Sequence, residues 1–396
     1  MASIIGRRAV LLGSLAAPAV VRTVRAQGAP IRFGTLTPQT GAGGSYGPPM
    51  VKAVMAVVAE INAAGGVGGR KIEIISEDDE TNPDSAVKAA RKLIDVDKVS
   101  AILGTWASAV TTAVAPLCWE NKVMLFTVSG GDGITRLPHQ GFIIRTQPDS
   151  GLQSTRFSAF MADQGVKRVF SLAAQTPFAA SIYTMMTDQL KPRGVEMLGQ
   201  IIYDASKTSF RTEIDQALKT KPDTLYLNSY APDVTVLLRE LYRAGFEGKK
   251  YTLAYAANPK VLASLPPEVT QGLVTMAPSP DVVSPAFKQV AAVVGADPDP
   301  YSCQAHDHIA LATLAAAKAG DASGPAIRDN VRKIGNRDGV KVTDAVEGLK
   351  LLAAGKEIDY EGASGSCKFT PIGDIEGCKF RFEVAEGGKS RVLSIS

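Results

Sequence analysis

The chain has 396 residues, of which 45% are hydrophobic and 21% are charged, an ordinary composition for a globular protein with enough length for two domains. The chain has 43 basic and 39 acidic residues, a formal net charge of +4. Four arginines and no acidic residue lie in the first 26 residues, so the rest of the chain has 39 of each and no net charge. A chain without net positive charge is not expected to bind nucleic acid or an anionic membrane surface.

The first 26 residues have the pattern of an export signal. A basic start is followed by the apolar run 9–21, which is too short for a membrane span, and by a cleavage site before Gln27. The pair Arg7–Arg8 directly before the run suggests the twin-arginine route, but Gly6 stands where that route usually has a hydroxyl residue. An ordinary Sec signal therefore remains an equal alternative, and either route predicts a periplasmic protein.

Short apolar strands and amphipathic helices alternate over most of the mature chain. Strands are predicted at 31–37, 70–80, 99–105, 123–129, 168–175, 196–204, 224–230 and 251–256. Helices are predicted at 49–66, 82–97, 108–121, 181–194, 210–221 and 233–245. This alternation predicts parallel sheets with helices on both faces. Because one sheet of so many strands would be unusual, we expect two doubly wound lobes.

The pattern after residue 280 becomes mainly helical and ends in a hairpin-like tail at 367–396. Such a late change predicts that the chain passes between the lobes more than once, first near Arg145 to Ser150. We expect one lobe from 27–147 plus 280–356 and a second from 148–279 plus 357–396. Two lobes joined by several crossings form a hinge with a cleft between them.

A catalytic or cofactor site is not predicted. The Gly-rich segment 41–47 fits neither a phosphate-binding loop nor a dinucleotide fingerprint, and no nucleophile elbow occurs. His306 and His308 stand two residues apart on a predicted helix and so point to different sides, which argues against a metal site. The acidic segment 77–80 is explained by its place before a helix N-terminus. A role of His306 in the cleft stays open as a lesser alternative.

The four cysteines are predicted to differ in oxidation state and burial. Cys367 and Cys378 flank a turn-like segment, and an exported protein can oxidise such a pair, so a disulfide is predicted between them. Cys118 lies in an apolar helix pattern and is expected to be a buried thiol, while Cys303 has no assigned role.

The stretch 102–116, ILGTWASAVTTAVAP, predicts a buried strand that turns directly into a helix. Free backbone N–H groups at such a turn can hold an anion, and the Ser108 hydroxyl can join them. Taken alone, the stretch favours a simpler interpretation, in which Ser108 only caps its own helix.

The segments FGTLTPQTG, AEINAAGGVGGRKIEIISEDDETNPDSAVKAARKLI and GLVTMAPSP resemble the periplasmic substrate-binding proteins of the branched-chain amino-acid class of ABC transporters. The resemblance covers nearly the whole mature chain, residues 31 to 396. It implies an α/β type I periplasmic binding fold, with two doubly wound Rossmann-like lobes joined by a three-crossing hinge. It also implies a monomer that binds a small-molecule carboxylate ligand and docks on the permease subunits of an ABC transporter, with no enzymatic activity and no cofactor.

The resemblance implies a set of carboxylate-binding residues. Ser108 corresponds to the family hydroxyl that holds the ligand carboxylate together with backbone N–H groups. Ser129 keeps a second hydroxyl at the next strand end, whereas Gly131 replaces the family's threonine there. The interpretation of Ser108 as a ligand residue is now favoured over the capping role.

Aromatic residues form the rest of the predicted site. By resemblance, Tyr46 is the aromatic of the first lobe, and Phe178 and Tyr230 are those of the second. Trp106 and Tyr255 can supply further aromatic faces against an apolar ligand body, although Trp106 is almost as well explained by packing in a core or between lobes.

One position departs from the amino-acid binders of this family. They place an acidic residue, which holds the ligand ammonium, at the position of Ala256. Asp233 is close in sequence but is expected to cap a helix. Because a buried ammonium without a counter-charge is costly, we predict an aromatic or related monocarboxylate without an amino group, of the benzoate, hydroxybenzoate or phenylpropanoid type. The alternative is a branched-chain amino acid.

Overall fold

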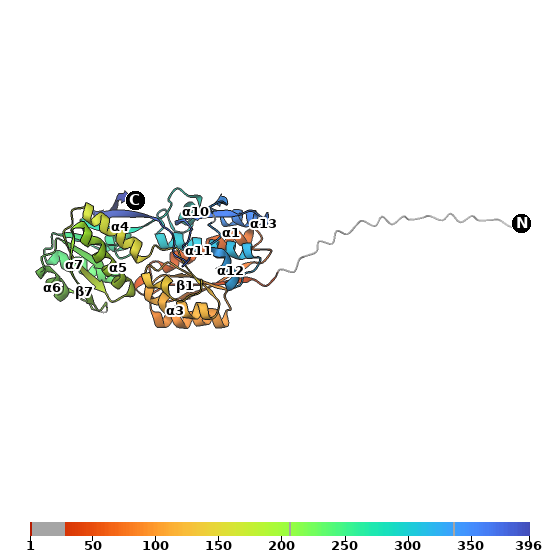
Figure 1. Cartoon of the computed structure of the whole chain (residues 1–396), viewed down its shortest axis with the longest axis horizontal. Coiled ribbons are helices and arrows are strands. Elements are labelled where there is room, and N and C mark those ends of the chain that lie inside the picture. Colours follow the sequence, from red (N-terminus) through yellow and green to blue (C-terminus); the bar gives the residue numbers. More distant parts are fainter. Residues whose placement is uncertain (2–27, 206, 336) are drawn as a thin grey trace.

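The computed structural model describes residues 1, 28–205, 207–335 and 337–396, so the predicted export signal, apart from Met1, lies outside the described residues. Two lobes lie side by side, and the blue C-terminal part of the chain returns from the lobe that contains α1 to the lobe that contains α4 (Figure 1). We call residues 31–145 plus 285–375 lobe 1, and residues 150–279 plus 379–395 lobe 2.

Lobe 1 is built on a parallel sheet with strand order β2-β1-β3-β4-β5. Its strands are β1 (Ile31–Thr37), β2 (Ile72–Asp78), β3 (Ala101–Thr105), β4 (Met124–Thr127) and β5 (Ile143–Arg145). The helices between them are α1 (Gly47–Ala63), α2 (Pro83–Arg91) and α3 (Ser108–Glu120). β3 lies at the centre and is buried along its length, which explains its continuous apolar sequence.

The later part of lobe 1 is mainly helical, as the sequence predicts. It contains α10 (Pro285–Val294), α11 (Pro300–Ala319), α12 (Gly324–Val331), α13 (Ala345–Ala353) and a small sheet of β11 (Val340–Val342), β12 (Ile358–Gly362) and β13 (Gly365–Ser366). α11 packs against α1, α12, α13 and β3, and most of its side chains are buried. A helix covered on all sides is expected to be largely apolar, and α11 is so from Ile309 to Ala317 apart from Thr313. Its earlier buried polar side chains Gln304, Asp307 and His308 have hydrogen-bond partners.

Lobe 2 is built on a mixed sheet with strand order β15-β14-β10-β9-β8-β6-β7. Its strands are β6 (Arg168–Ala174), β7 (Glu196–Tyr203), β8 (Thr224–Asn228), β9 (Lys249–Leu253), β10 (Leu273–Ser279), β14 (Lys379–Glu386) and β15 (Lys389–Ile395). Its helices are α4 (Ser150–Asp163), α5 (Pro177–Leu190), α6 (Arg211–Lys219), α7 (Ala231–Arg243), α8 (Pro259–Ser264) and α9 (Pro267–Thr270). The predicted α/β architecture of two doubly wound lobes is confirmed.

Three segments cross between the lobes, after β5, after β10 and before β14. The first and third are joined by a buried ion pair, in which Arg145 Nη2 lies 2.6 Å from Asp374 Oδ1. The third crossing comes later than predicted, because residues 357–375 pack with lobe 1. Ile358 and Tyr360 lie in its core, and Asp307 of α11 accepts a hydrogen bond of 2.7 Å from the N–H of Ala363.

The predicted disulfide between Cys367 and Cys378 is wrong in this structure, where both are free thiols. Cys367 is buried in the core of lobe 1, whereas Cys378 packs against the core of lobe 2. The segment between them does turn back, with an antiparallel bridge between Phe369 and Ile375, but Cys378 lies beyond this turn and packs with lobe 2, so the cysteines belong to different lobes. Cys118 and Cys303 are buried free thiols.

Candidate ligand cavity between the lobes

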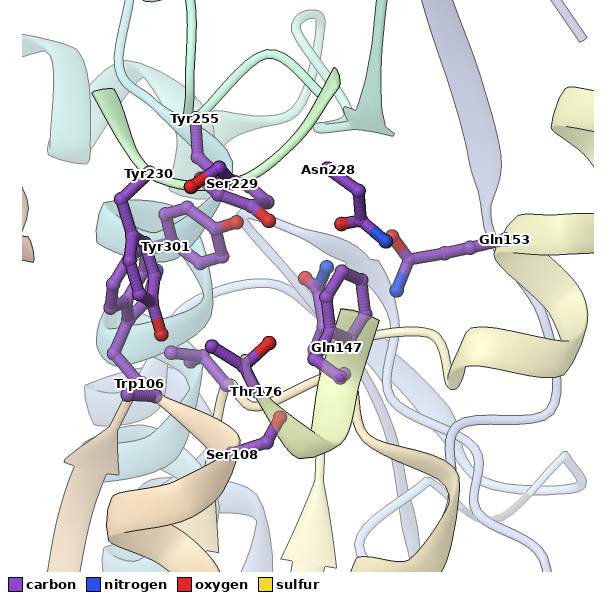
Figure 2. A pocket seen from close by; sticks show the side chains of 14 residues that line it. Trp106, Ser108, Gln147, Gln153, Thr176, Asn228, Ser229, Tyr230, Tyr255 and Tyr301 are labelled. Atoms are coloured by element: carbon purple, nitrogen blue, oxygen red, sulfur yellow. The ribbon is translucent and has the colours of Figure 1, made fainter. Parts of the chain in front are cut away.

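A cavity lies between the two lobes, at the carboxyl ends of their parallel strands, and its empty space, together with its opening to solvent, is about 460 Å³. This is where open α/β sheets bind ligands. Figure 2 shows side chains entering the cavity from several directions, with Ser108 and Asn228 on separate walls. The lining residues are Trp106, Ala107, Ser108, Val128, Gly130, Gln147, Gln153, Thr176, Phe178, Asn228, Ser229, Tyr230, Tyr255 and Tyr301.

Three helices begin at this cavity. α3 of lobe 1 follows β3, and α5 and α7 of lobe 2 follow β6 and β8. The residues that precede their first turns, Ala107, Thr176 and Tyr230, all line the cavity. Each helix N-terminus carries a partial positive charge and unpaired N–H groups. Among the described residues no lining side chain is charged, but the first turn of α7 contains Asp233, so the N-termini of α3 and α5 are the ones that favour an anion without a protein carboxylate in their first turn.

Ser108 does not cap its own helix. The N-cap of α3 is Ala107, whose methyl group cannot accept a hydrogen bond. Ser108 Oγ accepts a hydrogen bond of 3.0 Å from the N–H of Gly131. Because that N–H uses one lone pair of the hydroxyl oxygen, the hydroxyl hydrogen is available to a ligand oxygen. This geometry supports the ligand-binding interpretation of Ser108.

Four predicted ligand residues do not line the cavity, namely Tyr46, which belongs to the aromatic cluster around Trp106, and Ser129, Gly131 and Ala256. Ser129 Oγ donates a hydrogen bond of 2.8 Å to the carbonyl oxygen of Trp106 and so holds the turn before α3. Gly131 positions Ser108 through its N–H, and a Cβ atom at Gly131 would meet Ser108 Oγ at 2.9 Å. Ala256 lies in the core of lobe 2, while the preceding residue, Tyr255, lines the cavity.

Aromatic rings from both lobes form one cluster around Trp106. The Trp106 ring stacks on Tyr46 at 5.5 Å between centroids and tilts against Tyr230 at 5.5 Å. The edges of Tyr255 and Tyr301 meet it at 5.6 Å and 5.8 Å. Tyr46 therefore supports Trp106 from behind and lines an adjoining groove rather than the cavity itself. Both proposed roles of Trp106, ligand contact and interlobe packing, are compatible with this position.

Several lining residues were missed by sequence analysis. Gln147 belongs to the first crossing and Gln153 to α4. Asn228 is the last residue of β8 and Ser229 follows it, while Tyr301 lies in the first turn of α11. The positions of Asn228 and Ser229 at a strand end were a usable signal, since ligands bind at that edge of a parallel sheet. Tyr301 carried no such signal, because its helix reaches the cavity through tertiary packing.

Asp233 is not the cap of α7, contrary to expectation. The N-cap is Tyr230, and Asp233, in the first turn, accepts a hydrogen bond from Ser229 Oγ. Burial raises the pKa of Asp233 above its usual value. The carboxyl group thus lies behind Ser229, one hydrogen bond away from the cavity.

His306 lies within α11 and does not line the cavity; its ring nitrogens contact Asp307 Oδ1 at 3.0 Å and Gln289 Oε1 at 3.3 Å. Over the described part of the chain, His, Cys, Asp and Glu side chains form no group of three or more that could share a metal ion. None of the helices in that part is long and apolar enough to cross a membrane.

The family comparison identifies this class of protein. Residues 30–370 match the model of the periplasmic binding protein family, so the chain belongs to that family. It is a small-molecule-binding protein of the ABC transporter type, as the resemblance implied. One curated relative is the chemotactic signal transduction system substrate-binding protein BasB of Halobacterium salinarum, 25% identical over 355 residues that cover 87% of this chain and 84% of the relative.

Solved structures support the type I fold. The leucine-binding protein LivK of Thermotoga maritima has a TM-score of 0.79 at 20% identity, covering 92% of this chain and 98% of that chain. A solute-binding protein of an ABC transporter from R. palustris, solved in complex with benzoate, has a TM-score of 0.76 at 18% identity, covering 92% and 96%. At these identities the likeness concerns the fold.

Proposed function

We propose that this protein captures an aromatic or related monocarboxylate without an amino group and delivers it to the permease of an ABC importer. The observation that carries the proposal is the meeting of three helix N-termini, two of them without an acidic residue in the first turn, at a cavity whose described lining side chains carry no charge. The partial positive charge at the helix ends stabilises a bound carboxylate, and the faces of Trp106, Phe178 and Tyr255 can pack against an aromatic ring.

The proposed mechanism is closure of the two lobes around the ligand. The carboxylate binds Ser108 and the N–H groups at the start of α3, and the ring is enclosed by residues of both lobes. Ser129 and Gly131 act indirectly, by holding the turn and the serine hydroxyl in place. In this proposal the protein has no catalytic role, acts as a monomer in the periplasm, and is exported by the Sec or twin-arginine route.

The benzoate complex of the R. palustris protein supports the ligand class, because it shows that this fold can enclose an aromatic acid. The alternative ligand, a branched-chain amino acid, is favoured by one specific feature. The buried carboxyl group of Asp233 lies behind Ser229 and would attract an ammonium placed against that serine.

Ligand binding by the mature protein tests the proposal. The protein is unfolded, dialysed to remove bound ligand and refolded, and its melting temperature is measured with benzoate-type acids and with leucine, isoleucine and valine. We expect the aromatic acids to raise the melting temperature by several degrees at a hundredfold excess over Kd, because ligand binding to the native state stabilises it. Stabilisation by the amino acids alone would overturn the proposal and assign Asp233 as the counter-charge.

A further inference from the structure

The Asn228 side chain presents a fixed and unpaired acceptor to the cavity. Asn228 is the last residue of β8, lines the cavity and is 2% exposed. Its Nδ2 donates a hydrogen bond of 3.3 Å to the carbonyl oxygen of Ala179. Because a carbonyl can only accept, this contact fixes the orientation of the amide. Oδ1 therefore points the other way, and it has no partner among the described residues (Figure 2).

The neighbouring residue strengthens this acceptor character. Ser229 also lines the cavity, and its hydroxyl hydrogen is directed to the carboxyl group of Asp233. The Ser229 oxygen therefore faces the cavity with lone pairs rather than with a hydrogen. Figure 2 shows Asn228 and Ser229 on the wall away from Ser108. A ligand whose carboxylate lies at Ser108 thus reaches a wall of acceptors at its other end.

A donor stands at the same cavity. Gln147 Oε1 accepts a hydrogen bond of 2.8 Å from Gln304 Nε2, which turns the Gln147 amide nitrogen away from Gln304. Gln147 lines the cavity with Asn228. A hydroxyl can donate to one amide and accept from another, whereas an ammonium or amide N–H can only donate.

We propose that Asn228 Oδ1 binds a hydroxyl group of the ligand, so that the protein selects a hydroxylated aromatic acid over the unsubstituted ring. This inference rests on the proposed function and names the substrate class more narrowly. A buried acceptor left unpaired is costly, and a ligand without the donor leaves Asn228 Oδ1 in that state when the cleft closes. Sites built to bind a hydroxyl reject analogues that lack it for this reason.

Isothermal titration of the refolded mature protein tests the inference. The probes are benzoate, 3-hydroxybenzoate, 4-hydroxybenzoate and the two fluorobenzoates in which fluorine replaces the hydroxyl at nearly the same size. For the wild type, we expect one hydroxybenzoate to bind at least about tenfold more tightly than benzoate and than its own fluoro analogue. In Asn228→Leu, which keeps the volume but removes the acceptor, we expect this preference to fall to about twofold or less.

Asn330→Leu is the matched control, since Asn330 Nδ2 likewise donates to a backbone carbonyl, that of Ala326, in α12 away from the cavity. This variant should keep the wild-type preference. Equal affinity of the wild type for hydroxy and fluoro analogues would overturn the inference and leave the proposed function standing. The same conclusion follows if Asn228→Leu keeps the preference. If none of these acids binds and leucine does, both the proposed function and this inference are wrong.

Discussion

Tyr46 of lobe 1 donates a hydrogen bond of 2.9 Å from its hydroxyl to the carbonyl oxygen of Tyr255 in lobe 2. The same hydroxyl accepts a hydrogen bond of 3.1 Å from Asn258 Nδ2. Both contacts join the two lobes, so separating the lobes at this point breaks them. Tyr46 therefore contributes to the stability of the closed state without lining the cavity.

Replacing Tyr46 by phenylalanine keeps the stack on Trp106 and removes both interlobe hydrogen bonds. Net losses of about 0.5–1.5 kcal/mol per bond shift the population away from the closed state. The two bonds together are worth about 1–3 kcal/mol, so we expect affinity for the aromatic acid to fall about fivefold or more, measured by titration calorimetry. Tyr242→Phe, at a half-exposed tyrosine of α7, is the control and should leave the affinity unchanged. An unaltered Kd in Tyr46→Phe would contradict this role.

Ser108→Ala removes the hydroxyl that Gly131 holds beside the start of α3. A lost hydrogen bond to a charged group, with the Gly131 N–H left unpaired, predicts a loss of about tenfold or more in carboxylate affinity. The control is Ser323→Ala, which removes a true helix cap, the acceptor for the N–H of Ala326. That variant should lower the melting temperature and leave Kd as it was, whereas Ser108→Ala should raise Kd.

Gly130→Ala closes the cavity. A Cβ atom there would meet Phe178 Cε2 at 2.7 Å and Gln153 Nε2 at 2.8 Å, so at least one lining side chain must move. We expect binding of the aromatic acid to fall by more than about tenfold, with a normal circular dichroism spectrum. Gly133→Ala is matched in sequence and chemistry, but its Cβ meets nothing within 4 Å. Full binding by Gly130→Ala would show that the ligand lies elsewhere.

We expect Asp79 to give the free energy of unfolding an unusual dependence on pH. Burial raises the pKa of this carboxyl to about 7, and its Oδ2 has no partner among the described residues, as suits a protonated group. The native state then binds a proton that the unfolded state has lost, so the free energy of unfolding decreases as pH rises from about 4 to 7. Asp79→Asn should remove this part of the decrease, measured by urea unfolding at several pH values.

Asp78→Asn is the contrasting variant for that experiment. Burial alone would raise the pKa of Asp78, but hydrogen bonds from the Thr40 hydroxyl and the backbone outweigh burial and lower it. Its carboxylate stabilises the fold above the unfolded pKa and loses that contribution as pH falls. The two neighbouring variants should therefore change the pH dependence in opposite directions. Identical pH profiles for wild type and Asp79→Asn would refute the assignment of a protonated carboxyl.

Free thiols are expected in the mature protein. Because Cys367 and Cys378 pack in different lobes, the denatured, unreduced protein should titrate with four thiols per chain. A reductant should leave the melting temperature unchanged. A result of two thiols per chain would support the disulfide that the sequence predicted, and the third crossing would then have to be arranged differently.

The sequence was sufficient for the features that depend on local patterns. Strand and helix periodicity and the change to helices after residue 280 predicted two doubly wound lobes, and the resemblance of the segments from 31 to 396 predicted the family. The strand-to-helix turn singled out Ser108, but this local pattern alone favoured a capping role, and the resemblance to the family made Ser108 a predicted ligand residue.

Tertiary packing decided what local patterns do not encode. The hydroxyl of Ser129 points to a backbone carbonyl rather than to the cavity, and Asp233 lies behind Ser229 rather than at a helix cap. Tyr301 enters the site on α11, nearly two hundred residues after Trp106. The orientation of Asn228, at the end of β8, depends on the carbonyl of Ala179 in α5. Sequence periodicity determines which elements form and which faces they bury, whereas the direction of a polar side chain depends on partners that only the packed lobes bring within hydrogen-bonding distance.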